Sequence, residues 1–203
     1  MEIYLIGGSP CSGKSTIAQV LAEEYGLHVF KVDDHLHQYT KMGARDGKEC
    51  CAGVANMSPD KIWLRPPEVQ CREELQIYEE IFEYILADLE CLAHKAGVIT
   101  EGAAYLPALA KRKHIPFNRY ISITPTKGFQ VFHYSKREWV PFVLDGCSDR
   151  KRAFANWMER DALFAKAVQG QCTEYGYASL INRGDQSVKE LSDIVAVHFG
   201  LSE

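Results

Sequence analysis

The fold is decided near the amino terminus by the stretch Gly8-Ser-Pro-Cys-Ser-Gly13-Lys14-Ser15. This stretch matches the pattern G-x-x-x-x-G-K-[ST], follows a short apolar run at residues 3–6 and opens a predicted helix over residues 15–25. In that setting the backbone N–H groups of the turn and the positive end of the helix dipole bind phosphate oxygens. The alternative is an ordinary glycine-rich turn between a strand and a helix.

The residue types of this phosphate loop predict a nucleoside triphosphate with its metal ion. Gly8 and Gly13 allow the backbone to curl so that its N–H groups point at phosphate oxygens. Lys14 is expected to bridge the β- and γ-phosphates, and the Ser15 hydroxyl is expected to ligate Mg²⁺. We therefore predict ATP and Mg²⁺ as cofactors, with GTP left open. The residues predicted to bind the nucleotide are Gly8, Cys11, Ser12, Gly13, Lys14, Ser15, Thr16, Arg150 and Arg183.

The rest of the chain alternates short apolar strands with longer helices. Strands are predicted at residues 3–6, 28–32, 98–100, 120–123 and 178–181. Helices are predicted at residues 15–25, 68–95 and 150–168, and after Ser187, where Ser187-Val-Lys-Glu190 fits a capping box. Residues 40–67, which hold three glycines and three prolines, are predicted to be irregular. This alternation predicts a three-layer α/β/α sandwich with a five-stranded parallel sheet.

Length and composition indicate a single domain. The 203 residues, with 46% hydrophobic and 25% charged residues, are average for one globular unit. We expect one domain over residues 1–203, with an acceptor-binding region at about 35–95 and a helical lid at about 127–168. The net charge of −4 argues against a nucleic-acid partner. Residues 111–160 nevertheless carry 11 basic and 4 acidic side chains, so we expect this segment to handle an anionic group.

Cysteine usage and hydropathy predict a reduced, cytoplasmic protein. The chain starts Met1-Glu2-Ile3-Tyr4 without basic residues, and no apolar stretch approaches ~18 residues, so we expect neither a leader nor a membrane partner. A chain of this length needs no disulfides, and its seven cysteines are an odd number. We interpret Cys50-Cys51 as loop thiols rather than a redox or metal element, since no second pair or histidine lies at zinc-ligand spacing.

Two aspartates, Asp33 and Asp34, follow the second predicted strand. They lie at the carboxyl edge of the sheet, where open α/β sheets bind ligands. A carboxylate there can accept the proton of an attacking hydroxyl or hold water on Mg²⁺. Both are therefore candidate catalytic residues, and Asp33 is also a candidate metal ligand. The alternatives are a loop or helix-capping pair, or a metal cluster with His35 and His37, whose spacing points them opposite ways on a helix.

Glu101 ends the third predicted strand and is followed by Gly102. An acidic residue at the end of a buried strand is unusual for a core position. Glu101 is therefore expected to reach Mg²⁺ through water or to orient the nucleophile. Gly102 is expected to lie beside it at the substrate.

Two further groups of residues are candidates for the lid and for the acceptor site. The lid candidates are Arg150, Arg152 and Arg160, because arginines brought over a triphosphate stabilise the charge of the transition state. The alternative for this run is a solvated helix face. In the acceptor region, arginines would hold an anionic group and Trp63 would stack on a ring, the alternative being a packed tryptophan with surface arginines. The acceptor candidates are Arg45, Trp63, Arg65 and Arg72.

Together these residues resemble the small-molecule kinase branch of P-loop proteins, which includes adenylate, shikimate and gluconate kinases and chloramphenicol phosphotransferase. The resemblance covers nearly the whole chain in order. It implies a sheet of strand order 2-3-1-4-5, ATP with Mg²⁺, and an acceptor held under a helical region. By resemblance, Asp34 takes the place of the strand-two carboxylate that contacts or deprotonates the acceptor, with Asp33 as the alternative. The stretch Asn182-Arg-Gly-Asp185 lies where these kinases place an adenine-contacting loop.

The leading hypothesis is ATP-dependent phosphoryl transfer to a hydroxyl or phosphate of a small metabolite. A second hypothesis is a nucleotide-dependent switch with a protein partner, although the third strand lacks a D-x-x-G element at its edge. A third is a regulatory module that binds nucleotide without catalysis. The sequence leaves the acceptor and the oligomeric state open.

Overall fold

The computed structural model describes residues 2–92, 94–95 and 97–202 and is built around a five-stranded sheet. All strands are parallel to their neighbours, and their order is β2-β3-β1-β4-β5, as predicted. Because the strands are parallel, the carboxyl ends of β1, β2 and β3 meet at one edge of the sheet. The strands are β1 (Glu2–Gly8), β2 (His28–Lys31), β3 (Gly97–Glu101), β4 (Tyr120–Pro125) and β5 (Ala178–Asn182).

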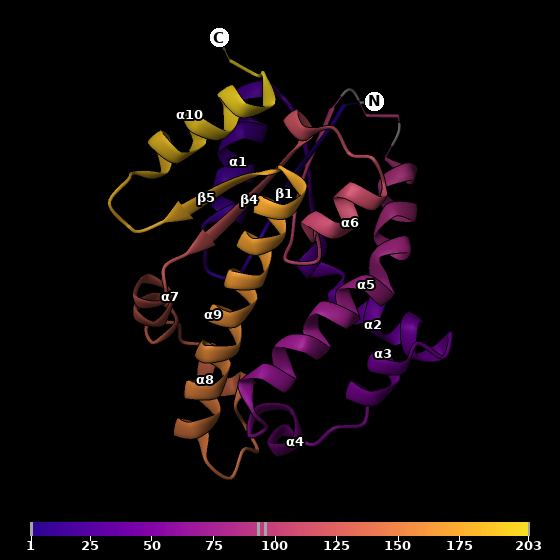
Figure 1. Cartoon of the computed structure of the whole chain (residues 1–203), viewed down its shortest axis with the longest axis vertical. Helices are drawn as coiled ribbons and strands as arrows, with labels where there is room; N and C mark the ends of the chain where they lie inside the picture. Colours follow the sequence, from indigo (N-terminus) through magenta and orange to yellow (C-terminus); the bar gives the residue numbers. More distant parts are fainter. Residues whose placement is uncertain (1, 93, 96, 203) are drawn as a thin grey trace.

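Helices cover both faces of the sheet and give the predicted three layers (Figure 1). One face carries α1 (Lys14–Tyr25) and α10 (Val188–Phe199), and the other carries α5 (Pro67–Cys91), α6 (Pro107–Arg112) and α9 (Arg150–Tyr175). Side chains of β1 alternate between the two layers, since successive residues of a strand point to opposite faces. Tyr4 and Ile6 pack with α1 and α10, whereas Leu5 packs with α5 and α9.

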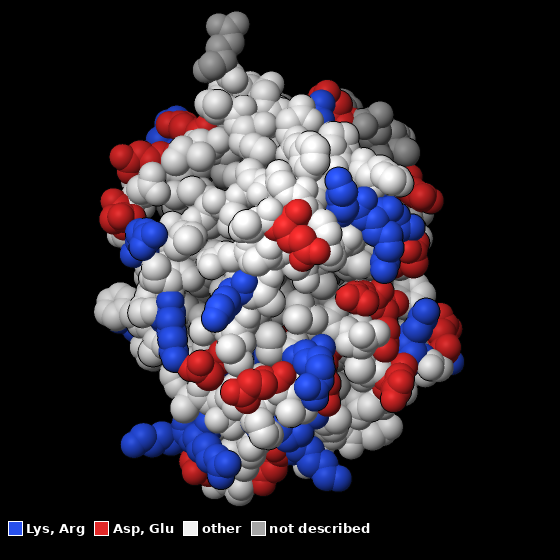
Figure 2. Space-filling model, viewed as in Figure 1, with Lys and Arg blue, Asp and Glu red and all other residues white. Residues whose placement is uncertain are grey.

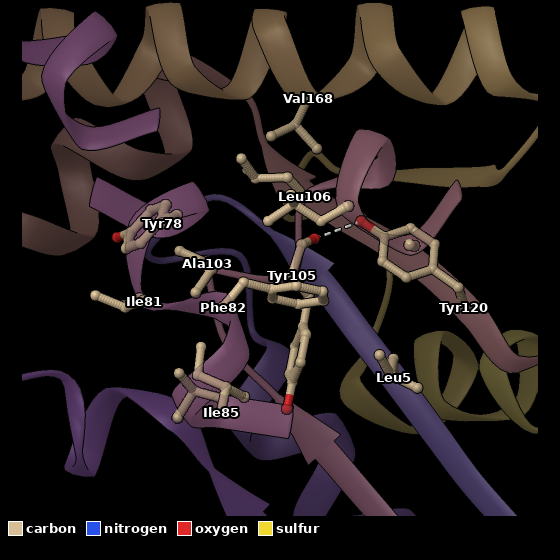
Figure 3. Packing of buried hydrophobic residues seen from close by; sticks show 14 of the residues in the cluster. Leu5, Tyr78, Ile81, Phe82, Ile85, Ala103, Tyr105, Leu106, Tyr120 and Val168 are labelled. Atoms are coloured by element: carbon tan, nitrogen blue, oxygen red, sulfur yellow. Dashed lines mark hydrogen bonds between the residues drawn. The ribbon is translucent and has the colours of Figure 1, made fainter. Parts of the chain in front are cut away.

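The larger core lies between the sheet and the α5 and α9 layer (Figure 3). Tyr105 follows β3 and meets Phe82 of α5 edge to face, with ring centroids 6.4 Å apart. The Tyr120 hydroxyl donates a hydrogen bond to the Tyr105 carbonyl oxygen at 2.7 Å. These contacts fix the segment after β3, and so they hold the neighbouring Glu101 in place at the edge of the sheet.

Three helices lie between residues 36 and 63, so the predicted irregular structure over residues 40–67 is wrong. Gly43 lies inside a helix, and the close approach of a second helix explains why this position is a glycine. A Cβ there would come within 2.7 Å of the Cys51 sulfur. Pro59 opens a helix in its first turn, after the Ser58 cap, where proline is favoured. Residues that predict loops therefore start or pack helices here. The three helices are α2 (Leu36–Arg45), α3 (Glu49–Val54) and α4 (Pro59–Trp63).

The lid region consists of α7 (Lys127–Tyr134), α8 (Val140–Val143) and the first half of α9. A small cluster that includes Tyr134, Val140 and Trp157 joins these helices. The predicted capping box at Ser187 and Glu190 is confirmed at the start of α10. Helix α9 runs further than predicted, to Tyr175, and α5 ends at Cys91 rather than Lys95. Across the described residues, we find no helix with the length and apolarity needed to span a membrane.

Candidate active site

The phosphate loop connects β1 to α1 in a conformation that few residue types tolerate. Gly8 has a φ of 120°, and a Cβ at this position would lie 1.9 Å from the Ile123 carbonyl oxygen of the adjacent strand. Gly13 has a φ of 92° and caps the start of α1. Lys14 follows it, only 5% exposed, and its Nζ donates a hydrogen bond to the Ser9 carbonyl oxygen at 2.9 Å. The loop thus presents a desolvated ammonium and the amino end of α1 to the same space.

A hollow of about 320 Å³ lies over this loop and is closed on its far side by the lid. We call it the phosphate hollow. The Ser15 and Thr16 side chains are exposed, whereas Ser12 is buried. Burial raises the pKa of the Cys11 thiol, so this side chain is a neutral part of the wall. The phosphate hollow is lined by Pro10, Cys11, Ser12, Gly13, Lys14, Ser15, Thr16, Asp33, Tyr134, Arg137 and Trp139.

Of the two aspartates after β2, Asp33 is the one that lines the phosphate hollow. Both belong to a 3-10 turn over Val32–Asp34, and both are exposed. Asp34 is not among the described residues that line this hollow. The Asp33 charge also contributes to raising the pKa of Glu101, which lies across the sheet edge. Of the two aspartates, Asp33 is therefore the one that the structure places at the phosphate hollow.

Glu101 is buried at the end of β3, with 2% of its surface exposed. Burial raises the pKa of its carboxyl, and the nearby Lys14 ammonium offsets part of that rise. Its Oε2 atom has no hydrogen-bond partner among the described residues. Gly102 packs against Val32, because a Cβ there would come within 2.7 Å of the valine Cβ. Glu101 is thus an unsatisfied acceptor beside the phosphate loop, while Gly102 serves close packing.

Arg137 is the lid cation that lies over the phosphate loop. It follows α7, and its Nη2 lies 3.6 Å from the Cys11 sulfur. Its guanidinium also lies over two aromatic rings, 4.9 Å from the Tyr134 centroid and 5.3 Å from the Trp139 centroid. These contacts hold a positive charge on the wall of the phosphate hollow, which Lys14 also lines. The sequence prediction missed Arg137, and the only local signal is that two aromatic residues flank it.

A second hollow, of about 220 Å³, adjoins the phosphate loop on the side of α7 and α10, and we call it the α7 hollow. Its wall includes Phe129 and His133, whose ring centroids are 4.1 Å apart. Asn182 at the end of β5 also lines it, and its Nδ2 donates a hydrogen bond to the Ser12 carbonyl oxygen at 3.0 Å. The predicted Arg183 is exposed and is not among its described lining residues. The α7 hollow therefore offers a space with aromatic and polar walls beside the phosphate loop.

Comparison with known proteins gives the family. The family model for isopentenyl transferase matches residues 1–166. The chain belongs to the isopentenyl transferase family. A search of curated proteins found no match.

Two solved structures share the fold of this isopentenyl transferase family member. Shikimate kinase from Acinetobacter baumannii, in complex with shikimate, has 15% identity and a TM-score of 0.50, covering 99% of this chain and 94% of that chain. TT1252 from Thermus thermophilus has 16% identity and a TM-score of 0.52, covering 100% of this chain and 98% of that chain. At such identities the likeness shows the fold alone. The family match indicates a transferase, and the two structures show that its fold is that of a P-loop kinase.

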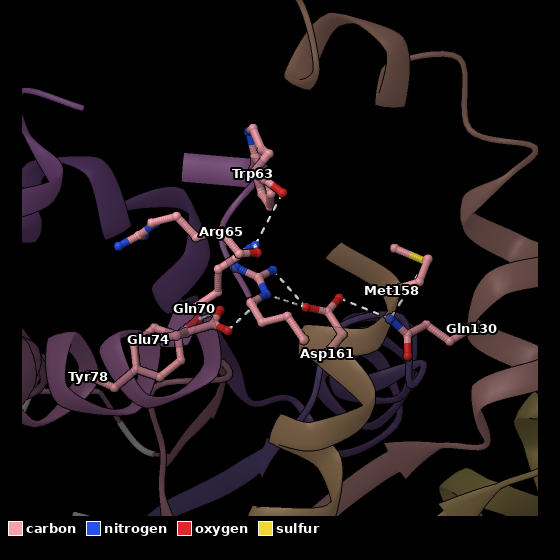
Figure 4. A network of polar contacts seen from close by, with 9 residues as sticks. Trp63, Arg65, Gln70, Glu74, Tyr78, Gln130, Met158 and Asp161 are labelled. Atoms are coloured by element: carbon pink, nitrogen blue, oxygen red, sulfur yellow. Dashed lines mark hydrogen bonds and ion pairs between the residues drawn. The ribbon is translucent and has the colours of Figure 1, made fainter. Parts of the chain in front are cut away.

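In this member of the isopentenyl transferase family, each of the three predicted lid arginines either pairs with an acidic side chain or is exposed. Arg150 pairs with Asp145, and Arg152 is exposed at the start of α9. Arg160 forms ion pairs with Asp161 at 2.6 Å and with Glu74 at 3.2 Å (Figure 4). None of the three is among the described residues that line the phosphate hollow. Their positions do not support the predicted catalytic roles.

Several side chains of the basic segment are neutralised by acidic partners. Lys127 pairs with Glu159, and Lys113 pairs with Glu83 of α5. Figure 2 shows basic side chains gathered at the lower end of the molecule with acidic side chains beside them. Part of the positive charge of residues 111–160 is therefore used in ion pairs, and among the described residues of this segment Arg137 is the cation that lines the phosphate hollow.

The acceptor-region candidates separate into two groups. Arg65 pairs with Glu73 at 2.6 Å and lines a pocket between the helices, described below, whereas Arg45 and Arg72 are exposed. Trp63 packs against Trp157 of the lid, with ring centroids 4.8 Å apart. The packed-tryptophan alternative therefore describes Trp63. Arg65 remains a candidate acceptor-binding residue, because it lines a pocket.

The histidine and cysteine alternatives have structural explanations. His35 stacks on Phe30, with ring centroids 5.1 Å apart. Glu80 accepts the backbone N–H groups of Cys50 and Cys51 at 3.0 and 2.9 Å, and all seven cysteines are free thiols. Within the described ranges, no cluster of three or more His, Cys, Asp or Glu side chains is arranged to hold a metal ion.

Proposed function

We propose that this chain is a Mg²⁺-dependent kinase that transfers the γ-phosphate of ATP to a hydroxyl group of a small molecule. The observation that carries the proposal is the phosphate hollow, where Lys14, Asp33 and Arg137 converge from three separate elements. Two cations on one hollow suit the charge that builds on a phosphoryl group during transfer, and a carboxylate in the same hollow suits the acceptor hydroxyl.

The α7 hollow supports a nucleotide as the donor. It adjoins the phosphate loop at Gly13 and Thr16, so one ligand can occupy both spaces. Its Phe129 and His133 rings provide faces on which a base can stack, and Val188 and Leu191 add apolar surface. A base with its triphosphate matches this combination of aromatic faces and a cationic loop.

The transfer is a single displacement in which atoms and charge balance. The acceptor oxygen forms a bond to the γ-phosphorus, the bond from that phosphorus to the β,γ-bridging oxygen breaks, and ADP leaves. The hydroxyl proton moves to Asp33, which returns it to water after the product departs. Lys14 and Arg137 neutralise the equatorial oxygens during the step, and Tyr134 and Trp139 hold the Arg137 guanidinium in position.

The residues around Lys14 suit a magnesium ion. The Ser15 hydroxyl and the Asp33 carboxylate both line the phosphate hollow, and oxygen is the donor type that Mg²⁺ prefers. The buried Oε2 of Glu101, which lacks a partner among the described residues, is an acceptor available to a metal-bound water. Bound there, Mg²⁺ would draw charge from the β- and γ-phosphates.

The test is ADP release across a panel of small hydroxyl compounds. We expect one class of acceptor to stimulate release, Lys14→Ala to lose ATP binding, and Asp33→Asn to lower the rate ~10²–10⁴-fold, with Asp34→Asn as the matched control. ATP hydrolysis that no acceptor stimulates would instead support a nucleotide-dependent switch. Wild-type ATP affinity in Lys14→Ala would refute the assigned phosphate loop.

A second candidate function, isopentenyl transfer, is favoured by the family match over residues 1–166. In that reaction the acceptor attacks the carbon that bears a diphosphate, and the diphosphate leaves from the same cationic loop. Two observations make prenyl transfer the second candidate rather than the first. Polar side chains line most of the phosphate hollow. The Arg137 guanidinium already lies over the Tyr134 and Trp139 rings, which are the faces that would stabilise a carbocation. The assay with isopentenyl or dimethylallyl diphosphate in place of ATP separates the two: diphosphate release with an acceptor would favour prenyl transfer.

A further inference from the structure

A separate pocket of about 180 Å³ lies between the helices of the acceptor region and α9. We call it the inter-helix pocket. Leu36 lines it, and Asp33, three residues earlier, lines the phosphate hollow, so the start of α2 joins the two spaces. Aliphatic side chains from α2, α3, α4 and α5 form one part of its wall. The charged part of the wall consists of Arg65, Glu73, Glu74 and Arg160.

The positive charges of this wall are already neutralised. Arg65 Nη1 lies 2.6 Å from Glu73 Oε1. Arg160 lies between two carboxylates, with its Nη2 2.6 Å from Asp161 Oδ1 and its Nε 3.2 Å from Glu74 Oε2 (Figure 4). Two arginines therefore face three acids. An anionic acceptor would have to compete with glutamates that already occupy the guanidinium groups, so the pocket disfavours a further negative charge.

Two buried polar atoms of the Arg65–Glu73 pair, Arg65 Nε and Glu73 Oε2, lack hydrogen-bond partners among the residues that the structure describes. Glu74 Oε2 makes the ion pair with Arg160, and the Nε–H of Arg160 is directed at Asp161 Oδ1, at 2.8 Å. Buried groups without partners are costly. The Arg65–Glu73 pair therefore has unused hydrogen-bonding capacity of one acceptor and one donor.

The wall is also held rigidly. The carbonyl oxygens of Trp63 and Arg65 accept hydrogen bonds from Gln70 of α5 at 3.2 and 2.8 Å. The same two oxygens accept from Asn156 of α9 at 3.0 and 3.2 Å. The turn between α4 and α5 is thus clamped from both sides, and the Arg65 backbone is fixed at the pocket. A ligand meets a preformed set of groups.

We propose, building on the phosphoryl transfer proposed above, that the inter-helix pocket binds an uncharged, polyhydroxylated acceptor such as a sugar or cyclitol. Hydroxyl groups suit this wall, because each can donate to a carboxylate oxygen and accept from a guanidinium N–H without displacing either partner of an ion pair. The Arg65 and Glu73 side chains are 24% and 25% exposed, so both are accessible to such contacts. The carbon face of a ring packs on the aliphatic part of the wall. One further hydroxyl, directed past the start of α2, reaches Asp33, loses its proton there and receives the phosphoryl group as ADP leaves.

The first experiment compares acceptors that share a skeleton and differ in charge. ADP release is measured with ATP and Mg²⁺ across matched series of uncharged sugars and cyclitols, the corresponding acids such as glucuronate, and the corresponding amines such as glucosamine. We expect an uncharged member to stimulate release with a kcat/KM at least tenfold above those of its acid and amine. Stimulation by acids alone or by amines alone would overturn the inference and leave the proposed kinase intact.

The second experiment alters the pocket. Glu73→Gln keeps the shape but weakens a charge-assisted hydrogen bond, so we expect KM for the uncharged acceptor to rise about tenfold to a hundredfold. The substitution also removes the negative charge that pairs with Arg65, so the ratio of kcat/KM for the matched acid to kcat/KM for the sugar should rise. A merely structural role would not produce this change of preference. Glu79→Gln, an exposed position on the same helix, is the control and should change neither value.

ATP affinity separates the proposed acceptor pocket from the proposed kinase function. The Kd for ATP should be the same in wild type, Glu73→Gln and Glu79→Gln, and equal melting temperatures would show that the variants fold. If KM for the uncharged acceptor in Glu73→Gln stays within twofold of wild type, the inter-helix pocket is not the acceptor site. If ATP does not bind the wild type, or if diphosphate esters replace it as donor, the proposed kinase function fails, whatever the acceptor series gives.

Discussion

The position of Arg137 gives the sharpest test of the site, because the sequence analysis named Arg150, Arg152 and Arg160 as lid candidates and did not name Arg137. One arginine on a phosphoryl group is worth ~10³–10⁵ in rate, so Arg137→Ala should lower kcat at least about 10³-fold, equivalent to about 4 kcal/mol of transition-state stabilisation. The expected change in the free energy of unfolding is much smaller. The guanidinium is exposed and contacts two rings, and each such contact contributes about 0.5–1 kcal/mol, so the free energy of unfolding should fall by at most about 2 kcal/mol.

The assay is acceptor-stimulated ADP release, with urea unfolding measured on the same preparations. Arg137→Lys keeps the charge but loses the planar fork, so its rate should lie between those of the wild type and Arg137→Ala. Arg150→Ala removes an exposed pair with Asp145 and should keep the wild-type rate. A rate for Arg137→Ala within threefold of wild type, or an equal loss in Arg150→Ala, would refute the assignment of the lid cation.

Three further predictions concern stability and ligand response. Asp161→Asn breaks the buried contact to Arg160 and should lower the free energy of unfolding by about 3–5 kcal/mol in urea titrations, whereas Arg152→Ala on the exposed face should change it little. Glu101→Gln should raise the melting temperature at pH 8 and lower the catalytic rate, because burial raises the pKa of this carboxyl and its ionised form therefore opposes folding. For the same reason this group's contribution to wild-type stability should fall as pH rises above the usual range of a glutamate, and a melting-temperature difference between wild type and Glu101→Gln that is unchanged from pH 4 to pH 8 would contradict the argument. Trp139, 43% exposed at the phosphate hollow, should change its fluorescence when ATP binds, and Trp139→Phe should abolish the change while Trp63→Phe keeps it.

The parts of the site that the sequence predicted are local in the chain. The glycine-rich turn and the helix after it are signalled by neighbouring residues, and the short strands are recognised by their apolar composition. The strand order was implied by the resemblance to P-loop kinases, and the structure confirms it. Even Gly8 depends on a distant segment, because a Cβ there would meet the Ile123 carbonyl oxygen of the adjacent strand.

The features that were missed depend on contacts between distant segments. Gly43 resembles a loop residue until Cys51 packs against it, and only that contact explains a glycine within α2. Arg160 and Arg137 carry the same charge in the same basic segment. Asp161 and Glu74 bury the first, while Tyr134 and Trp139 support the second over the phosphate loop. Charge counting cannot distinguish these outcomes, since it ignores which acid lies opposite each arginine.

The buried network also limits which part of the lid is free to move. Gln130 of α7 donates to Asp161 of α9 at 3.0 Å, and Arg160 joins that carboxylate to Glu74 of α5. Separating these helices would leave buried charges without partners, which costs several kcal/mol. Helices α7 and α9 are therefore tied to the acceptor region. Residues 135–149 lie outside this polar network, but Val140 packs in the lid cluster and the Ser148 N–H donates to Asp60. Arg137, which is exposed and lies between these two anchors and α7, is thus the lid cation whose side chain can adjust to a ligand at the lowest cost.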